Sequence, residues 1–177
     1  MYDSIIAGQT DFLYGFGTLF VKQSTLLLRS CGGGITAWKG TNTTFANKYG
    51  VYVSDSRVLA ANTTVLQGRK GKCSLGRPWN ALHRSVFMHT YLDASLLPAG
   101  YTPWGGQPGG NLGANTTMAV YETYGPGNNE AAQRAGGVTM VMDSVGAKPY
   151  LRPVDVFMTP DGGQPNTGWI DPTALKS

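Results

Sequence analysis

Short apolar runs separated by turn-forming residues dominate the chain. Most runs are two or three residues long and rich in Val, Leu, Ile, Phe or Met, and clusters of Gly, Asn, Asp, Ser or Thr lie between them. This pattern predicts short strands joined by frequent turns. The predicted strands lie at residues 19–21, 26–28, 35–37, 51–53, 58–59, 86–88 and 140–142. A sandwich, a barrel or a β-helix could be built from such strands, and their irregular spacing does not choose among these folds.

The pattern changes between residues 98 and 127, where Gly, Pro, Asn and Thr become frequent. We expect this stretch to form long surface loops over the side or end of a core built from residues 1–95. Helix is expected to be nearly absent, apart from a turn around residues 130–134.

The composition supports one all-β domain that comprises residues 1–177. Apolar residues make up 41% of the chain and charged residues 14%, with 25 Gly and 10 Pro. This balance is poor in the Glu, Lys and Ala runs that are typical of helices. No stretch reaches the roughly 18 apolar residues that cross a bilayer, so we expect a soluble protein with no membrane partner.

The net charge of +4, from 14 Lys and Arg against 10 Asp and Glu, favours the approach of polyanions. Nucleic acid and acidic polysaccharide both meet this condition. The basic residues are scattered, however, apart from residues 69–72, which we interpret as a solvated loop. Since no basic stripe of the kind that follows a phosphate backbone is present, nucleic acid is not the expected partner.

Indications of the cellular compartment oppose one another. Residues 1–8 lack the basic start, apolar run and cleavage site of a secretory signal, which taken alone indicates the cytoplasm. Three Asn-Thr-Thr sequons, at Asn42, Asn62 and Asn115, would accept glycans in the secretory pathway. Cys31 and Cys73 permit one disulfide, but two free thiols fit the sequence equally well.

Several familiar catalytic patterns are missing from the sequence. The two cysteines, His83 and His89 lack the spacings of zinc ligands, and no Gly-x-Ser-x-Gly or phosphate-binding glycine motif occurs. We interpret both histidines as packed or surface residues.

The acidic residue Asp11 lies among aromatic and aliphatic residues in the segment "TDFLYG". A carboxylate in apolar surroundings is costly to desolvate unless a cation or several donors hold it ionised. The candidate partner is Arg77 in "SLGRPW", because a guanidinium pairs with a carboxylate through two parallel hydrogen bonds. Trp79, in the same segment, offers a flat apolar face on which a sugar ring could stack.

Six segments together resemble the pectin methylesterases, or pectinesterases, in a fungal-like form. The segments "TDFLYG", "LGRPW" and "YLDASLLPAGYTPW" are similar in order and spacing to the family stretches "VDFIFG", "LGRPW" and "YIDxxIxPxGWxPW". "GGGITAWKGTN", "GVYVSDSRV" and "ANTTMAVYETYGPG" extend the similarity to about residues 5–169. The resemblance implies a right-handed parallel β-helix, a single-stranded solenoid, that corresponds to the C-terminal part of the family domain and is truncated on its N-terminal side.

The resemblance also implies roles for individual residues. Asp11 matches the nucleophilic aspartate, and Arg77 matches the arginine that orients it and keeps it ionised. Trp79 matches a substrate-stacking tryptophan, Tyr14 replaces a Phe that lines a sugar subsite, and Trp104 would add to the sugar platform. Trp38 departs from the usual Gln of "TAQGR", which affects the expected loop contacts more than the chemistry.

The implied activity is hydrolysis of the methyl esters of pectin to give pectate and methanol, with no cofactor and no metal. Asp11 would attack the ester carbonyl and form an acyl-enzyme, which water then hydrolyses. The expected setting is a secreted, extracellular, cell-wall enzyme that acts as a monomer on homogalacturonan.

The family residues for the general acid and the oxyanion site lie upstream of the matched segments. The resemblance therefore implies that this chain, taken by itself, is nearly inactive. The alternative is a non-catalytic pectin-binding β-helix that keeps Trp79, Tyr14 and Trp104 as a sugar platform. A pectate lyase, which could share the architecture, would need calcium-binding acidic clusters that the sequence lacks.

Overall fold

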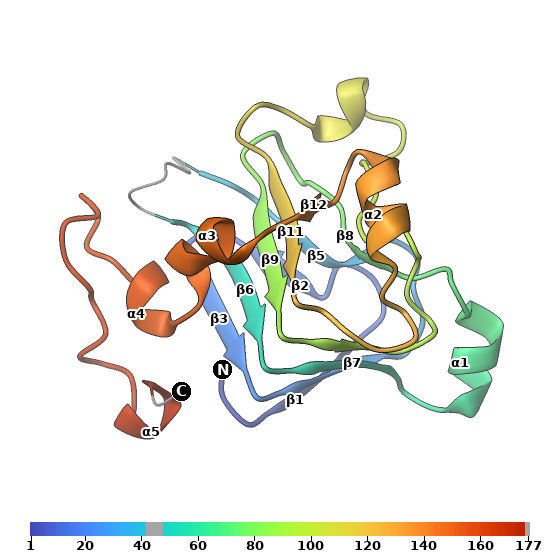
Figure 1. Cartoon of the computed structure of the whole chain (residues 1–177), viewed down its shortest axis with the longest axis horizontal. Helices are drawn as coiled ribbons and strands as arrows, with labels where there is room; N and C mark the ends of the chain where they lie inside the picture. Colours follow the sequence, from blue (N-terminus) through green and yellow to red (C-terminus); the bar gives the residue numbers. More distant parts are fainter. Residues whose placement is uncertain (42–47, 176–177) are drawn as a thin grey trace.

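Three parallel β-sheets form the walls of the molecule (Figure 1). The computed structural model describes residues 1–41 and 48–175. Sheet A contains β3 (Thr18–Lys22), β6 (Gly50–Ser54), β9 (Arg84–Met88), β11 (Thr117–Tyr121) and β12 (Met140–Val141). Sheet B contains β1 (Ile5–Gly8), β4 (Thr25–Leu28), β7 (Arg57–Ala60) and β10 (Tyr91–Leu92). Sheet C contains β2 (Leu13–Gly15), β5 (Gly34–Trp38) and β8 (Ser74–Gly76).

The chain visits the three sheets in a repeating order. From β1 to β9 each coil places one strand in sheet B, the next in sheet C and the next in sheet A. Successive coils pair in parallel, so that β4 lies between β1 and β7, and β6 lies between β3 and β9. This arrangement is a parallel β-helix, and it confirms the predicted fold class.

Apolar side chains fill the interior of the coils. In sheet A, Val21, Val53, Phe87 and Val120 stand side by side across four strands, and all four are buried. Their strands alternate inward and outward side chains, as a period of two residues requires. The interior is therefore a continuous stack in which each coil covers the next.

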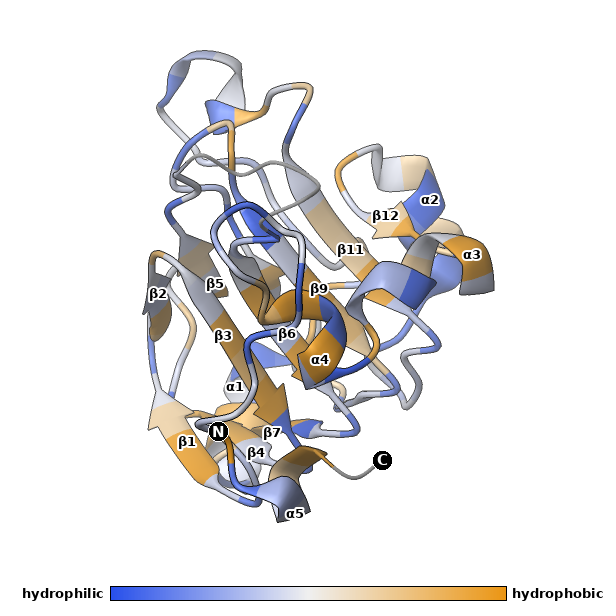
Figure 2. Ribbon diagram, turned by 90° about the vertical axis from the view of Figure 1, so that its left-hand side faces the viewer, coloured by the Kyte–Doolittle hydropathy of each residue, from blue (hydrophilic) through white to orange (hydrophobic). Residues whose placement is uncertain are grey.

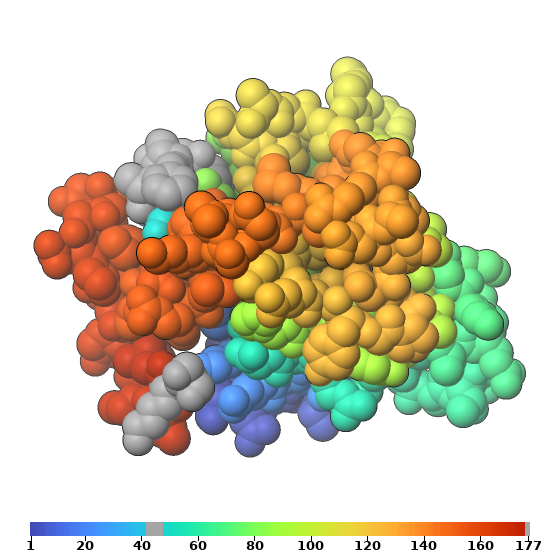
Figure 3. Space-filling view, viewed as in Figure 1, coloured from blue at the N-terminus to red at the C-terminus, as the bar shows by residue number. Residues whose placement is uncertain are grey.

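A second apolar layer covers the outer face of sheet A. Phe20, Tyr52 and Tyr150 form a stack with ring centroids 6.2 Å and 5.5 Å apart. Tyr150 belongs to η2 (Lys148–Tyr150), which lies between α3 (Ser144–Ala147) and α4 (Pro153–Val156). Figure 3 shows this orange-to-red segment spread over the face of the sheet, and Figure 2 shows apolar residues on β3, α3 and α4. Both faces of sheet A are consequently buried.

The corner between sheets A and B repeats one backbone conformation. Gln23, Asp55, His89 and Glu122 each follow a strand of sheet A and have φ between 47° and 50°. The backbone N–H of each of the first three donates to the last carbonyl of the next strand, at 3.0–3.2 Å. These left-handed residues turn the chain sharply and are stabilised by the register of the coils.

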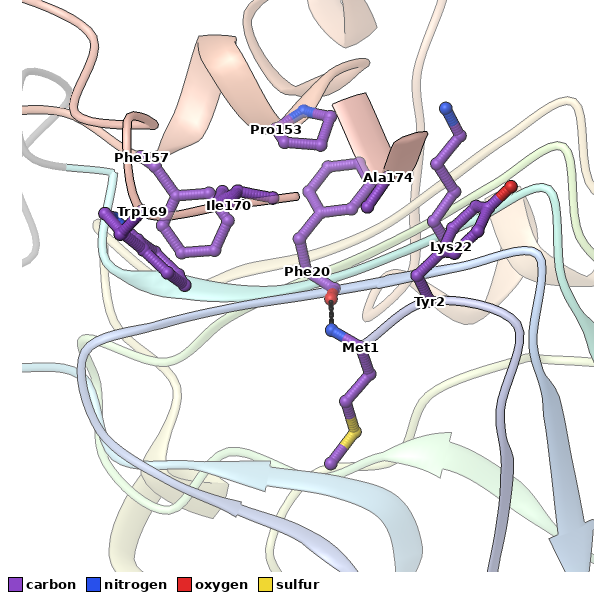
Figure 4. Close-up of a pocket in the computed structure, with 9 residues that line it drawn as sticks. All are labelled: Met1, Tyr2, Phe20, Lys22, Pro153, Phe157, Trp169, Ile170 and Ala174. Atoms are coloured by element: carbon purple, nitrogen blue, oxygen red, sulfur yellow. Dashed lines mark hydrogen bonds between the residues drawn. The ribbon is translucent and has the colours of Figure 1, made fainter. Parts of the chain in front are cut away.

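The C-terminal segment returns to the beginning of the chain. Figure 4 shows Phe157, Trp169 and Ile170 gathered beside Phe20, around an apolar hollow of about 70 Å³. The N-terminal amine of Met1 donates to the carbonyl of Phe20 at 2.7 Å. The short helix α5 (Pro172–Leu175) follows this contact.

The structure corrects two expectations. The described residues contain five short α-helices, including α1 (Thr63–Arg69) and α2 (Glu130–Gly136), of which only α2 was foreseen, as a turn. Asparagine N-caps begin both helices, and at seven residues each they are too short to show an apolar period. The stretch 98–127 contains the core strand β11 as well as loops and η1 (Pro108–Asn111), because its apolar residues 118–120 complete sheet A.

Candidate active site

Asp11 precedes the first strand of sheet C and is fixed by the neighbouring coil. Its φ of 49° places the backbone in the left-handed region, which Asp tolerates better than most residues. Its backbone N–H donates to the carbonyl of Gly34 at 2.7 Å, and its Oδ1 accepts from the Gly34 N–H at 3.0 Å. Two hydrogen bonds to one residue of β5 therefore set the direction of the carboxylate.

Arg77 directly follows β8, the third strand of the same sheet, and forms an ion pair with Asp11. Its Nε lies 3.1 Å from both carboxylate oxygens and its Nη2 lies 2.6 Å from Oδ2. The two residues are 66 positions apart in sequence, and the backbone N–H of Arg77, which donates to Thr36 at 3.0 Å, holds the arginine in register. The predicted pairing of Asp11 with Arg77 is thus present.

The ion pair is only partly covered. The Asp11 and Arg77 side chains keep 17% and 23% of their surface exposed, so the carboxylate is accessible from solvent. Gly33 allows the close packing, since a Cβ there would lie 2.7 Å from Asp11 Oδ1 and 2.8 Å from the Arg77 guanidinium carbon. Glycine at position 33 is therefore a requirement of the site.

Trp104 reaches the ion pair from the long loop after β10. The Arg77 guanidinium carbon lies 3.9 Å from the Trp104 ring centroid, a distance at which a cation is attracted to an aromatic face. Trp79 meets Trp104 edge to face, with centroids 5.4 Å apart. Asn111 anchors this loop by donating to the carbonyl of Trp79 at 2.9 Å.

Exposed aromatic side chains surround a shallow hollow beside the ion pair. Tyr14, Phe16 and Trp79 are 75%, 77% and 51% exposed. Together with Gly15, Ala37 and Lys39 they line about 290 Å³. Tyr14 and Ala37 are neighbours across β2 and β5. Such a surface is suited to the apolar face of a sugar ring, with Lys39 as a cation at its edge.

Sequence reasoning missed Phe16 and Lys39. The signal for Phe16 was available, because residues two apart on an extended backbone point to the same side, and Tyr14 was already a candidate. Lys39 directly follows β5, but nothing in its local sequence distinguishes it from other exposed lysines.

A buried polar network lies beneath this hollow. The Trp38 indole donates to the carbonyl of Gly17 at 3.1 Å, and the Trp38 backbone N–H donates to His83 Nδ1 at 3.1 Å. His83 Nε2 lies 2.8 Å from Ser85 Oγ, which in turn contacts the Tyr101 hydroxyl at 2.9 Å. Burial lowers the pKa of His83 to about 4. His83 is thus a packed, neutral histidine, in agreement with the prediction that it is a packed or surface residue.

A disulfide joins the segment before β5 to the segment before β8. Cys31 and Cys73 are bonded, with Cα atoms 5.4 Å apart, which decides between the two states that the sequence left open. Asn62 and Asn115 are exposed, whereas Asn42 lies outside the described residues. Arg69, placed with residues 70–72 in a predicted loop, instead ends α1.

The described residues show neither a cluster of metal-binding side chains nor a membrane-spanning helix. No group of three or more His, Cys, Asp or Glu side chains in residues 1–41 and 48–175 is arranged to hold a metal ion. No helix in this part of the chain is long and apolar enough to cross a membrane.

The chain is similar in sequence to known pectinesterases. The family model described as Pectinesterase matches residues 1–153. Probable pectinesterase/pectinesterase inhibitor 33 of Arabidopsis thaliana is 35% identical over 129 residues, which are 70% of this chain and 21% of that protein. Pectinesterase 2 of Citrus sinensis is 29% identical over 128 residues, which are 71% of this chain and 24% of that protein. The chain thus spans about a quarter of the length of these relatives.

Solved structures show the same fold. A pectin methylesterase from Aspergillus niger gives a TM-score of 0.71 at 21% identity, over 97% of this chain and 50% of that chain. The carrot pectin methylesterase gives 0.66 at 23% identity, over 88% and 48%. A pectin methylesterase in complex with a hexasaccharide gives 0.67 at 21% identity, over 90% and 52%. The chain spans about half the length of these structures.

Proposed function

The chain belongs to the pectinesterase family, and from this premise we propose that it takes part in hydrolysing the methyl esters of pectin. The proposed substrate is methyl-esterified homogalacturonan, and the products are pectate and methanol. The observation that carries the proposal is the Asp11–Arg77 ion pair, 2.6 Å at its shortest contact, beside a hollow lined by exposed aromatic rings.

Asp11 is the proposed nucleophile. One of its oxygens attacks the C6 carbonyl of the ester, the bond to the methoxy group breaks, and an acyl-enzyme forms on the carboxylate. Water then adds to the substrate carbonyl of this intermediate, which releases a galacturonate carboxylate and restores Asp11. Its partial exposure leaves the carboxylate open to the ester.

Arg77 is the proposed positioning residue for Asp11. Its fork contacts both oxygens of the carboxylate, so the nucleophile keeps one orientation before and after the reaction. Methoxide needs a proton as it leaves, and neither the nucleophile nor a permanently charged guanidinium can supply it. A further acid therefore completes the reaction.

Tyr14, Trp79 and Trp104 are the proposed substrate-binding residues. The first two present exposed rings to the hollow, and Trp104 covers the Arg77 guanidinium. A sugar stacked on these rings would bring its C6 substituent toward the Asp11 side of the site. Phe16, which lines the same hollow, extends the platform.

We also propose that the protein acts outside the cell, as a monomeric single domain on cell-wall pectin. The Cys31–Cys73 disulfide supports this setting, because disulfides persist mainly in oxidising compartments. The exposure of the sequon residues Asn62 and Asn115 is compatible with it.

The test is methanol release from highly methylated pectin by the longest form of the protein that its gene encodes. Asp11→Asn should lower kcat by roughly 10⁴-fold or more, because a nucleophile is removed. Arg77→Gln, which keeps a polar side chain without the charged fork, should lower kcat by a smaller factor. Full turnover by the Asn variant would remove Asp11 from its proposed role. Binding to pectin with no methanol release by the unsubstituted protein would favour the non-catalytic alternative.

A further inference from the structure

Two arginines share a second hollow, whose lining residues differ from those of the aromatic one. This hollow, of about 470 Å³, is lined by Arg29, Ser30, Thr64, Val65, Gly68 and Arg69. Arg29 follows β4, and Arg69 is the last residue of α1. None of the six lining residues carries a carboxylate, and the charged and polar side chains among them are two arginines, one serine and one threonine.

Neither arginine is neutralised by a neighbour. Among the described residues, no salt bridge involves Arg29 or Arg69, and α1 has no acidic residue in its first turn. By contrast, Arg134 and Arg152 elsewhere on the surface each pair with a carboxylate. Two guanidinium groups that face one hollow repel each other until an anion enters.

The disulfide fixes the two arginine-bearing segments relative to each other. Cys31 lies two residues after Arg29, Cys73 lies four residues after Arg69, and the two cysteines are bonded. The Arg29 backbone N–H also donates to Gly8 at 2.8 Å. The hollow is therefore organised before any ligand arrives, which lowers the entropic cost of binding.

The same segment connects the hollow to the proposed nucleophile. Residues 29–34 run from Arg29 to Gly34, whose N–H donates to Asp11 Oδ1 at 3.0 Å. Gly33, between them, packs against the Asp11–Arg77 pair. The arginine hollow is thus linked to the proposed nucleophile by six consecutive residues.

We propose that Arg29 and Arg69 bind a free carboxylate of a galacturonan chain that lies across the site. This inference rests on the proposed function, since it names a feature of the same substrate. Guanidinium groups bind carboxylates through charge-assisted, paired hydrogen bonds, whereas a methyl ester is neutral and has no second anionic oxygen. The arginine hollow therefore favours chains that already contain de-esterified sugars.

The experiment measures binding, without turnover, by isothermal titration calorimetry on the full chain at about 0.15 M salt, where long-range charge effects are screened. The probes are fully de-esterified galacturonate oligomers and fully methylated oligomers of equal length. Arg29→Gln combined with Arg69→Gln should weaken binding of the de-esterified oligomer by at least about tenfold and leave the methylated oligomer unchanged.

The matched control is Lys70→Gln combined with Lys72→Gln, which removes two charges just after α1 but outside the hollow. An equal loss in this control, or no loss in the arginine variant, would overturn the proposal. Arg69→Glu is a second variant that should also weaken binding of the de-esterified oligomer, and α1 has no buried residue whose packing it could disturb. Selective binding without any methanol release would contradict the proposed esterase function alone, and methanol release without selective binding would contradict this inference alone.

Discussion

Sheets A and C are two walls of the same coils, but they differ in what covers them. In sheet A, β6 and β9 are buried along all five residues, because the interior packs on one face and the C-terminal helices pack on the other. In sheet C, β5 and β8 are buried as well, but β2 has only three residues and exposes Tyr14, and the residues just beyond β5 and β8 include Lys39 and Arg77.

The two sheets therefore contribute differently to the stability of the fold and to the chemistry of the site. Residues of sheet A contribute buried apolar surface and little that a solute can reach. Residues of sheet C also contribute core side chains, among them Leu13, Ile35 and Leu75, but the ends of its strands carry an ion pair and a sugar platform. Substitutions of buried residues in sheet A should therefore act on unfolding, and substitutions of the exposed residues at the ends of the sheet C strands should act on catalysis.

The largest expected effect is on the stability of sheet A. Phe87 is fully buried and packs edge to face on Tyr101, with centroids 6.2 Å apart. Phe87→Ala should lower the free energy of unfolding by about 3–5 kcal/mol, measured by urea denaturation, because it leaves a cavity in the stack. Tyr14→Ala in sheet C, at a side chain that is 75% exposed, is the control and should change it by less than about 0.5 kcal/mol. Similar losses would erase the contrast between the sheets.

The next largest expected effect is the loss of stability at acidic pH through His83, in the buried network beneath sheet C. Burial lowers the pKa of His83 to about 4 from its usual 6.5, so the unfolded chain binds the proton more readily. The contribution of His83 is fully present above pH 6.5, falls as the pH drops, and is lost by about pH 4, a change of roughly 3 kcal/mol. Unfolding free energies of the wild type and of His83→Gln should converge over this window. Parallel curves would show that His83 does not titrate this way.

The third prediction tests how closely sheet C packs its ion pair. Gly33→Ala places a Cβ 2.7 Å from Asp11 Oδ1, and the displaced carboxylate should lower methanol release by about 10²-fold with little change in thermal unfolding. Gly32→Ala is the matched control, since its Cβ would have only Thr10 Oγ1, at 3.1 Å, within 4 Å. Equal activity of the two variants would contradict a requirement for glycine at position 33.

The smallest expected effect is on substrate binding. Trp79→Ala should raise KM for pectin roughly tenfold, equivalent to about 1.4 kcal/mol, by removing one ring from the platform. Tyr124→Ala, at a ring that is 54% exposed but outside the hollow, is the control and should leave KM unchanged. A lower kcat with unchanged KM would instead indicate that Trp79 acts through Trp104 on Arg77.

Most strands that the sequence predicted carry buried apolar runs. All seven predicted runs fall on strands β3, β4, β5, β6, β7, β9 and β12, except for Met142, which follows β12. The sequence did not predict β1, β2, β8, β10 or β11. Three of these, β2, β8 and β10, are two or three residues long and contain Gly, Ser or Tyr, β1 ends in Ala-Gly, and β11 lies in a stretch rich in Gly, Pro, Asn and Thr. Their strand conformation comes from pairing with a neighbouring coil rather than from local propensity.

The sequence by itself determined the residue types of the site. A carboxylate among apolar residues, such as Asp11, requires a cation, and the segment "SLGRPW" supplied Arg77 as the candidate cation. Only the tertiary structure decided which groups meet there. The parallel register brings Arg77 onto Asp11 across 66 positions, and the long loop brings Trp104 onto Arg77. It also forms the disulfide that sets Arg29 opposite Arg69. In a β-helix such contacts join successive coils, so they depend on strand register and turn length, which no local pattern of residues records.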